Sequence, residues 1–419
     1  MQIKISYGKE TIAINIPKPC TILTPNTMKP KNQHTIIQKA LKNPIGKESF
    51  EAFAKKARQL LVIVNDATRP TPTATILEQL YPILKSHPHV NFLVATGVHR
   101  EPTVEEYRFI FGKFYDVFKE HIFAHDARKE ENMTYLGRSK NGTEMYINTM
   151  VPESKNILVI GSVEPHYFAG FTGGRKSFLP GVASFKTIEM NHKLALSDHA
   201  CSLALEGNPV HEDMVDAMHV LKDLNVFSIQ TVLTADHKIH AVTAGDLLQS
   251  FSAAISHAKE VFCVPLEKRG NIVLTVAPYP MDIDLYQSQK ALDNGNLALE
   301  NDGIIILVSK CRMGVGEDAF LDLLCKADSP QEVLEILGDE YKLGYHKAAK
   351  MAQIGTRAQM WAVTDLDDAI VRKAMLKPYT KIQSAVDDAV KIMKEKGREP
   401  RVVVMPQGSL TIPLLTGGS

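Results

Sequence analysis

The sequence predicts an α/β fold, with two α/β domains that each contain a largely parallel sheet and an active-site cleft between them. Two observations support this prediction. Short apolar runs rich in β-branched residues alternate with segments of helical spacing along most of the chain. The length of 419 residues also exceeds what one compact core usually holds and fits two domains. A cleft between two such domains is the usual place for a ligand.

The first predicted domain covers residues 1–266 and opens with two alternating strands in MQIKISYGKETIAINIP. Its later strands are continuous apolar runs, as is typical of buried strands in a parallel sheet. These runs are LLVIV from Leu60, VNFLVAT from Val90, NILVI from Asn156 and VFSIQTVLT from Val226. A helical pattern over residues 74–84 lies between the first two runs, although Pro82 interrupts it.

The second predicted domain covers residues 267–400 and follows a linker over residues 259–271. It repeats the alternation of strands and helical patterns. Its predicted strands are NIVLTV from Asn271, GIIILV from Gly303, QMWAV from Gln359 and a last strand, RVVVM, from Arg401. The polar helical pattern over residues 381–396 is typical of a helix with a solvated face.

Composition narrows the classes of partner. The 48 Lys and Arg residues nearly balance the 47 Asp and Glu residues, and no basic stripe is visible, which argues against nucleic acid and for a small polar or anionic ligand. The longest apolar runs are far shorter than the roughly 20 residues that cross a bilayer, and the N-terminus lacks the apolar region of a signal peptide. The five cysteines form no C-x-x-C pair. We therefore expect a reduced, cytoplasmic chain that is not associated with a membrane.

Ionisable residues follow two consecutive predicted strands. The motif NDATRPTPT places Asp66 and Arg69 in a strand-to-helix turn, where backbone N–H groups and the helix dipole favour an anion. The planar guanidinium of Arg69 suits a carboxylate or phosphate. The motif ATGVHREPT places His99 in the same way, and open α/β sheets use such strand ends for active sites. The alternatives are a helix-capping Asp66 that pairs with Arg69, and a surface role for His99.

The segment over residues 161–194 is the most informative, because it places His166, Lys176 and His192 around a glycine-rich turn after a strand. These side chains suit a proton carrier, a nucleophilic amine and a metal ligand. The stretch GFTGGRKS resembles a phosphate-binding loop, but Arg175 stands where glycine must precede the lysine, which argues against a kinase or ATPase. A neighbouring cation and partial burial would lower the pKa of Lys176. The alternatives are a solvated Arg-Lys pair and a histidine that only decorates its helix.

Two further groups of residues are weaker candidates. In YPMDIDLYQSQKA, helical spacing places Tyr286, Gln287 and Lys290 on one face, while the two aspartates before them suit helix caps. His121 and His125 lie four residues apart, but no third ligand follows at a spacing typical of zinc sites. We interpret these two histidines as surface residues.

Together these motifs resemble those of the nickel-pincer lactate racemase family, the 2-hydroxyacid racemases and epimerases. The resemblance covers about residues 60–295 and rests on NDATRPTPT, TGVHREPT, EPHYFAGFTGGRKSFLPG, NHK and YQSQKA, in this order. The central motif is the most specific, because its histidine, lysine and second histidine follow one another at intervals of 10 and 16 residues (166 to 176 to 192). Family architecture also implies that residues 400–419, with the RVVVM strand, return to the first domain.

The resemblance implies a covalently attached cofactor, the nickel-pincer nucleotide (nickel pyridinium-3,5-bisthiocarboxylate mononucleotide), and cofactor-biosynthesis enzymes as partners. Lys176 would attach this cofactor, and His192 would be the protein's ligand to nickel. Asp66 would help to hold the cofactor. Soft sulfur donors with one imidazole suit Ni(II).

The resemblance also implies an isomerase that racemises lactate or a related 2-hydroxyacid, by hydride abstraction to the cofactor and through a 2-keto acid. His99 and His166 would be the two opposed acid/base residues, one for each enantiomer. The residues that would bind the substrate are Arg69, Lys290, Gln287 and Tyr286. The alternatives are a malate or sugar-acid epimerase of the same family and a non-catalytic binding protein that retains the cleft. The oligomeric state stays open, and a homo-oligomer is compatible with the sequence.

Overall fold

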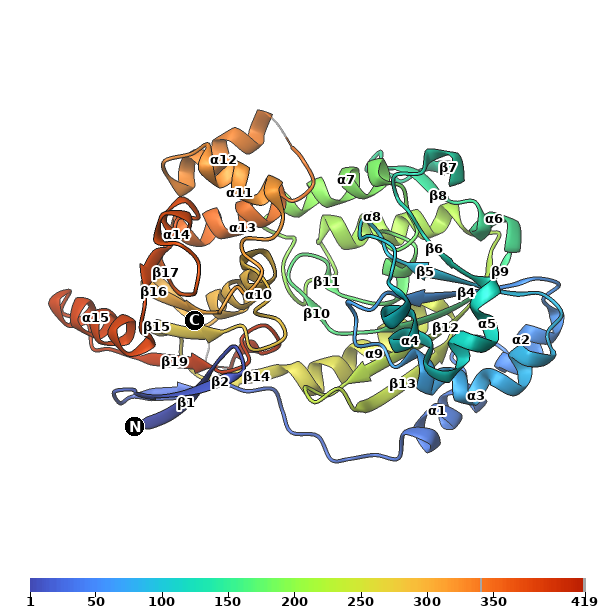
Figure 1. Cartoon of the computed structure of the whole chain (residues 1–419), viewed down its shortest axis with the longest axis horizontal. Coiled ribbons are helices and arrows are strands. Elements are labelled where there is room, and N and C mark those ends of the chain that lie inside the picture. The colour runs from blue at the N-terminus through green and yellow to red at the C-terminus, as the bar shows by residue number, and fades with distance from the viewer. Residues whose placement is uncertain (340, 417–419) are drawn as a thin grey trace. The chain divides into compact units, whose positions relative to one another are not determined.

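The computed structural model describes residues 1–339 and 341–416 and confirms the α/β class, with largely parallel sheets (Figure 1). The chain forms two compact units. Residues Thr27–Val261 make up one, which we call the central unit. Residues Met1–Asn26 and the chain from Phe262 onward make up the other, which we call the terminal unit. Among the helices described, none is both long and apolar enough to cross a membrane.

The central unit contains a six-stranded sheet in the order β13-β12-β9-β4-β5-β6. Its strands are β4 (Leu60–Asn65), β5 (Val90–Ala95), β6 (Ile122–Ala124), β9 (Asn156–Ser162), β12 (Asn225–Leu233) and β13 (Ile239–Gly245). All neighbours are parallel except β13, which runs antiparallel to β12 at the sheet edge. The predicted apolar runs therefore form the buried strands of one sheet, and their carboxyl ends mostly share one edge.

Helices and short elements connect these strands. The helices are α1 (Gln33–Lys42), α2 (Phe50–Lys56), α3 (Thr73–Ser86), α4 (Val104–Phe111), α5 (Tyr115–Phe118), α6 (Met150–Ser154), α7 (Phe185–Lys193), α8 (Pro209–Val220) and α9 (Leu247–Phe262). The short strands are β7 (Met133–Arg138), β8 (Glu144–Asn148), β10 (Pro165–His166) and β11 (Gly170–Phe171), and five 3-10 turns complete the described unit: η1 (Gly112–Phe114), η2 (Lys119–His121), η3 (Glu130–Asn132), η4 (Gly174–Ser177) and η5 (Leu194–Leu196). The helix predicted over residues 74–84 is present as α3, with Pro82 inside it.

Both faces of the central sheet are buried. On β4, Leu60, Val62 and Val64 belong to a core cluster with apolar residues of α1 to α4, and the alternate residues Leu61 and Ile63 are equally buried. This two-sided burial explains why the strand is a continuous apolar run rather than an alternating one.

The terminal unit has a second six-stranded sheet in the order β18-β17-β16-β15-β19-β3, all parallel. Its strands are β3 (Cys20–Ile22), β15 (Gly270–Val276), β16 (Leu299–Val308), β17 (Gln359–Val363), β18 (Lys377–Tyr379) and β19 (Val402–Met405). A hairpin of β1 (Gln2–Tyr7) and β2 (Glu10–Asn15) and a pair of β14 (Cys263–Leu266) and β20 (Ile412–Leu415) accompany it. Its helices are α10 (Leu285–Asn296), α11 (Asp318–Cys325), α12 (Pro330–Asp339), α13 (Tyr345–Gly355), α14 (Asp368–Lys373) and α15 (Ile382–Glu395).

The composition of the units differs from the predicted boundaries of 1–266 and 267–400. Residues 1–26 join the terminal unit, because β3 pairs with β19 and the apolar side chains of the β1-β2 hairpin are buried in the terminal core. The RVVVM strand is β19, which pairs with β15 and β3, so residues 400–416 stay in the terminal unit rather than returning to the first domain. Both differences arise from strand pairing between distant segments, which local pattern does not encode.

Candidate active site

Three neighbouring parallel strands of the central sheet, β9, β4 and β5, end at one edge and place the predicted residues there. The loops after these strands are joined by side-chain hydrogen bonds. Thr71, after β4, lies 2.9 Å from the hydroxyl of Ser162 at the end of β9 and donates to Asn65 at 2.9 Å. The loop that carries Asp66 and Arg69 is therefore held against the start of the segment that carries His166.

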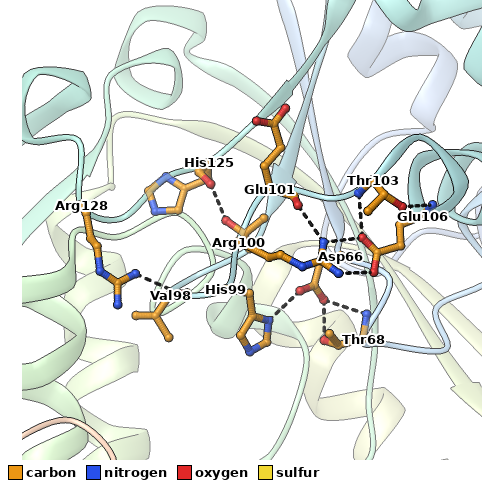
Figure 2. A network of polar contacts seen from close by, with 11 residues as sticks. Asp66, Thr68, Val98, His99, Arg100, Glu101, Thr103, Glu106, His125 and Arg128 are labelled. Atoms are coloured by element: carbon orange, nitrogen blue, oxygen red, sulfur yellow. Dashed lines mark hydrogen bonds and ion pairs between the residues drawn. The ribbon is translucent and has the colours of Figure 1, made fainter. Parts of the chain in front are cut away.

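Asp66 is the buried centre of a hydrogen-bonded group after β4. Its carboxylate contacts Nδ1 of His99 at 2.7 Å and accepts from the hydroxyl of Thr68 at 2.6 Å, and Figure 2 shows both side chains pointing to it. Burial opposes ionisation of Asp66, but the hydrogen bonds with His99 and Thr68 outweigh burial and lower the pKa of this carboxyl. An ionised Asp66 favours the tautomer of His99 with the proton on Nδ1, so that Nε2 is the basic nitrogen.

The loop that carries His99 is fixed at its far end by the start of α4. Thr103 and Glu106 form a capping box, and the guanidinium of Arg100 bonds both carboxylate oxygens of Glu106 at 2.7 and 2.9 Å (Figure 2). Arg128 donates to the backbone oxygen of Val98 at 3.2 Å. The imidazole of His99 is 47% exposed, so a base with a fixed orientation faces solvent.

Arg69 does not take the predicted alternative role of partner to Asp66. Its guanidinium lies 3.8 Å from Glu164, which follows β9, and both side chains are about one quarter exposed (29% and 24%). Asp66 is not a helix cap either, because α3 begins at Thr73 and has Pro72 at its N-cap. A long ion pair of this kind is weak and leaves the guanidinium able to bind another carboxylate.

His166 and Lys176 meet beside the β10-β11 turn. Nζ of Lys176 lies 3.1 Å from Nε2 of His166, and the backbone N–H of Ala169 donates to Nδ1 of the same ring at 3.3 Å. The imidazole of His166 therefore lies within hydrogen-bonding distance of the amine that would act as a nucleophile. The predicted lowering of the Lys176 pKa stays a prediction.

His192 is presented by α7, which begins after the capping residue Ser184. Its side chain is buried, and burial together with the positive charge of Lys176 lowers its pKa to about 3. The ring is therefore neutral at physiological pH. A neutral imidazole is the form that binds a metal ion.

Phe168 joins the three predicted residues of this segment. Its ring lies edge-to-face with His166 at 4.5 Å and with His192 at 5.1 Å between centroids, and Nζ of Lys176 lies 5.3 Å from its centroid. Tyr167 stacks on His166 at 5.0 Å. We call these five residues the Phe168 cluster. The two aromatics were missed in the sequence, although they stand between His166 and the glycine-rich turn.

Arg175 has a structural position in the glycine-rich turn. It is fully buried, donates to the backbone oxygens of Ala169 at 2.7 Å and Gly173 at 3.2 Å, and lies over the ring of Phe251 at 4.4 Å. Burial lowers its pKa to about 9. The alternative of a solvated Arg-Lys pair is therefore wrong. Gly174 has φ of +53°, and a Cβ there would lie 2.7 Å from Phe251, which explains the glycine without a phosphate.

The two weaker candidate groups have different outcomes. His121 is exposed as predicted, but His125 is buried and bonds the backbone oxygen of Ala183 at 2.9 Å, so its surface assignment is wrong. In the terminal unit, Asp284 caps α10 by accepting from the backbone N–H of Gln287 at 2.6 Å. Burial raises the pKa of the Tyr286 hydroxyl.

The structure places charged residues beside Tyr286 that the sequence motifs do not indicate. Lys347 of α13 lies 3.9 Å from the centroid of the Tyr286 ring. On α10, Asp293 is half-buried, and its desolvation raises its pKa to about 7 against the opposing charges of Lys350 and Lys347. The substrate contacts predicted for Tyr286, Gln287 and Lys290, and the cleft between the units, stay predictions.

Comparisons with known proteins show which family this chain resembles. The family model described as the lactate racemase N-terminal domain matches residues 7–203, and that of the lactate racemase C-terminal domain matches residues 266–412. The chain is 30% identical to the lactate racemase of Thermoanaerobacterium thermosaccharolyticum over 97% of each protein. It is 31% identical to the lactate racemase of Lactiplantibacillus plantarum over 90% of each protein.

Solved structures agree with these matches. The lactate racemase apoprotein from Thermoanaerobacterium thermosaccharolyticum superimposes with a TM-score of 0.90 at 30% identity and covers 99% of this chain and 100% of its own. A protein from Thermotoga maritima has a TM-score of 0.65 at 16% identity and covers 87% of this chain and 97% of its own, a likeness of fold.

Proposed function

The chain belongs to the lactate racemase family and is an isomerase of the racemase type, and we propose that it interconverts the enantiomers of lactate or a closely related 2-hydroxyacid. The observation that carries this proposal is the Phe168 cluster, in which a lysine and two histidines lie around one aromatic ring. The orientation of His99 by Asp66 supports it.

The residues of the Phe168 cluster fit the family's nickel-pincer nucleotide. The amine of Lys176 is the group that would hold the cofactor covalently, and its contact with Nε2 of His166 places a group able to accept its proton beside it. The neutral, buried imidazole of His192 is the group that would bind the nickel ion. When bound, this cofactor would supply an acceptor for hydride from the substrate. Asp66 would contribute to holding the cofactor through the loop after β4.

The two histidines would handle the hydroxyl proton of the substrate. A 2-hydroxyacid presents its hydroxyl on opposite sides in its two enantiomers, so that each enantiomer needs its own base within about 3 Å. We assign these bases to Nε2 of His99, whose ring is oriented by Asp66, and to the imidazole of His166, whose Nδ1 is bonded by Ala169. Each base would return a proton when the other has accepted one.

Arg69 would bind the substrate carboxylate. Its guanidinium is partly exposed, and its approach to Glu164 at 3.8 Å is long enough for a carboxylate to compete. A carboxylate held at a fixed point leaves the substrate carbon free to present either face. Tyr286, Gln287 and Lys290 remain further substrate-binding residues by resemblance.

Replacement of Lys176 tests the cofactor assignment. After co-expression with the cofactor-biosynthesis enzymes, wild type should show the mass of the attached nucleotide and racemise lactate, as followed by chiral chromatography. Lys176→Ala should lose both the added mass and the activity, because the attaching amine is gone. Lys186→Ala, at an exposed lysine of α7 outside the motifs, is the matched control and should keep both. An added mass that persists in Lys176→Ala would overturn the attachment site.

A substrate panel tests which 2-hydroxyacid is used. Arg69 recognises a carboxylate and leaves the remainder of the substrate undefined. Lactate, malate and sugar acids should be compared at equal cofactor loading, with the highest kcat/KM expected for lactate. A higher value for malate or a sugar acid would replace lactate as the substrate and leave the racemase assignment intact.

A further inference from the structure

We propose that His240, His257 and Glu260 form a binding site for a divalent transition-metal ion of the zinc type, separate from the Phe168 cluster. His240 belongs to β13, the edge strand of the central sheet. His257 and Glu260 belong to α9, where a spacing of three residues places them on one face. The proposal is independent of the proposed racemase function.

The three side chains converge on a small volume. One possible ligand atom from each residue, two imidazole nitrogens and a carboxylate oxygen, lies within 4.8 Å of the others. Nε2 of His240 lies 3.0 Å from Oε2 of Glu260, and Nδ1 of His257 lies 3.3 Å from the same oxygen. The two rings are 6.0 Å apart and tilted by 74°, so they approach the carboxylate from different directions.

The chemistry of the three ligands selects the class of ion. Two imidazoles and a carboxylate suit zinc and neighbouring first-row metals, whereas calcium and magnesium prefer sites made of oxygen atoms. Three protein ligands leave a fourth position, which water fills in tetrahedral zinc sites. A metal ion would replace the contacts between the two imidazoles and Glu260, and each neutral imidazole would keep its proton on the ring nitrogen that faces away from the metal.

One of the three residues is buried and held in place, and the other two are exposed, so that a metal ion can reach the site from solvent. The side chain of His240 is only 5% exposed, whereas His257 and Glu260 are 39% and 53% exposed. The nearby ammonium of Lys31 is bonded to the backbone oxygen of His240 at 2.9 Å. A metal ion here would link α9, the last helix of the central unit, to strand β13.

Calorimetric titration with zinc tests the proposal on the full chain purified without the nickel cofactor. Wild type should bind zinc at this site, and His257→Gln and Glu260→Gln should each weaken that binding at least tenfold. Both positions are exposed, so that folding should be kept. His219→Gln, at an exposed histidine of α8, is the matched control and should bind as wild type does. Any zinc bound at His192 is common to all four proteins and cancels in the comparison.

Thermal unfolding gives a second readout. At about 100 times the dissociation constant, zinc should raise the Tm of wild type by roughly 5 °C, and this rise should be absent in His257→Gln. Equal zinc stoichiometry and affinity in wild type, His257→Gln and Glu260→Gln would overturn the proposal. Failure of wild type to bind zinc at micromolar concentrations would overturn it as well. Neither result would bear on the Lys176 mass measurement.

Discussion

Two regions of the central unit use histidine in opposite electrostatic settings. After β5, His99 is half exposed and hydrogen-bonded to the ionised carboxylate of Asp66. After β9, His192 is buried beside the cation of Lys176, and its pKa is about 3. A carboxylate orients a ring and fixes its tautomer, which suits a base. Burial beside a cation keeps a ring neutral, which suits a metal ligand. The two histidines are the same residue type, so the neighbouring charges and the burial of each ring distinguish the proposed base from the proposed metal ligand.

The largest expected effect comes from removing the buried ring. His192→Ala should reduce nickel content to background and abolish racemisation, because the proposed ligand is lost, while the mass of the nucleotide on Lys176 remains. Nickel per chain by elemental analysis and intact mass are the measurements. His99→Ala is the matched variant and should keep nickel while turnover stops. Equal nickel content in His192→Ala and His99→Ala would contradict the assignment of His192, rather than His99, as the nickel ligand.

Removing the charge of Asp66 tests whether this carboxylate orients His99 for catalysis. Asp66→Asn should lower kcat by about 100-fold, because His99 loses the ionised partner that fixes its tautomer. Nickel content and the attached nucleotide should stay near wild type, because Lys176 and His192 would hold the cofactor and Asp66 would only add to this. Asp116→Asn, which replaces an exposed carboxylate paired with Arg108, is the control and should leave kcat unchanged. A loss of cofactor in Asp66→Asn would show that the contribution of Asp66 to holding the nucleotide outweighs its effect on His99.

The pH dependence of stability tests how a buried neutral histidine behaves. Burial lowers the pKa of His125 to about 4, below its ordinary 6.5. As the pH falls below 6.5, this histidine becomes protonated in the unfolded chain before it does in the folded chain, which favours unfolding. The stability that the neutral ring contributes is therefore fully present above pH 6.5 and is lost between pH 6.5 and 4. Through His125, the free energy of unfolding should fall by about 1 to 2 kcal/mol between pH 7 and pH 5.

Denaturant unfolding at a series of pH values measures this share. His125→Asn should lose part of the slope of unfolding free energy against pH, whatever its stability at pH 7. His121→Asn, at an exposed histidine, should keep the slope of wild type. An unchanged slope in His125→Asn would show that this ring becomes protonated in the folded chain.

The smallest expected effect concerns the ion pair at the end of β9. Glu164→Gln should lower KM for the substrate by about two- to fivefold, because a partly exposed pair contributes up to about 1 kcal/mol and its removal leaves Arg69 to the substrate. The kcat should change little. Steady-state kinetics in both directions provide the measurement, and a raised KM would mean that Glu164 positions Arg69 instead.

Much of the fold was predictable because its strands are locally distinct. The apolar runs from Leu60, Val90, Asn156 and Val226 are β4, β5, β9 and β12, since a strand buried on both faces needs apolar side chains at every position. The candidate site was predictable in part for the same reason. Polar residues directly after parallel strands gather at one edge, as Asp66 and His99 do.

Other features depended on contacts between distant segments. The pattern over residues 1–26 predicts strands but cannot say that β3 pairs with β19 of the terminal sheet. Arg175 is of a residue type usually found at the surface, yet it is buried, its guanidinium donates to two backbone oxygens, and it lies over the face of Phe251. His240, His257 and Glu260 share no motif, because a strand and a helix bring them together.

The sequence by itself determined the α/β class, the positions of most strands and the family motifs, because periodicity and turn chemistry are local properties of the chain. Only the tertiary structure decided which sheet each strand joins, which histidines are buried and which charges face them. Strand partners and the pKa values of ionisable groups depend on packing between residues far apart in sequence. The motif can therefore name His192 and His99, but the neutral ring of the first and the oriented ring of the second arise from the folded environment.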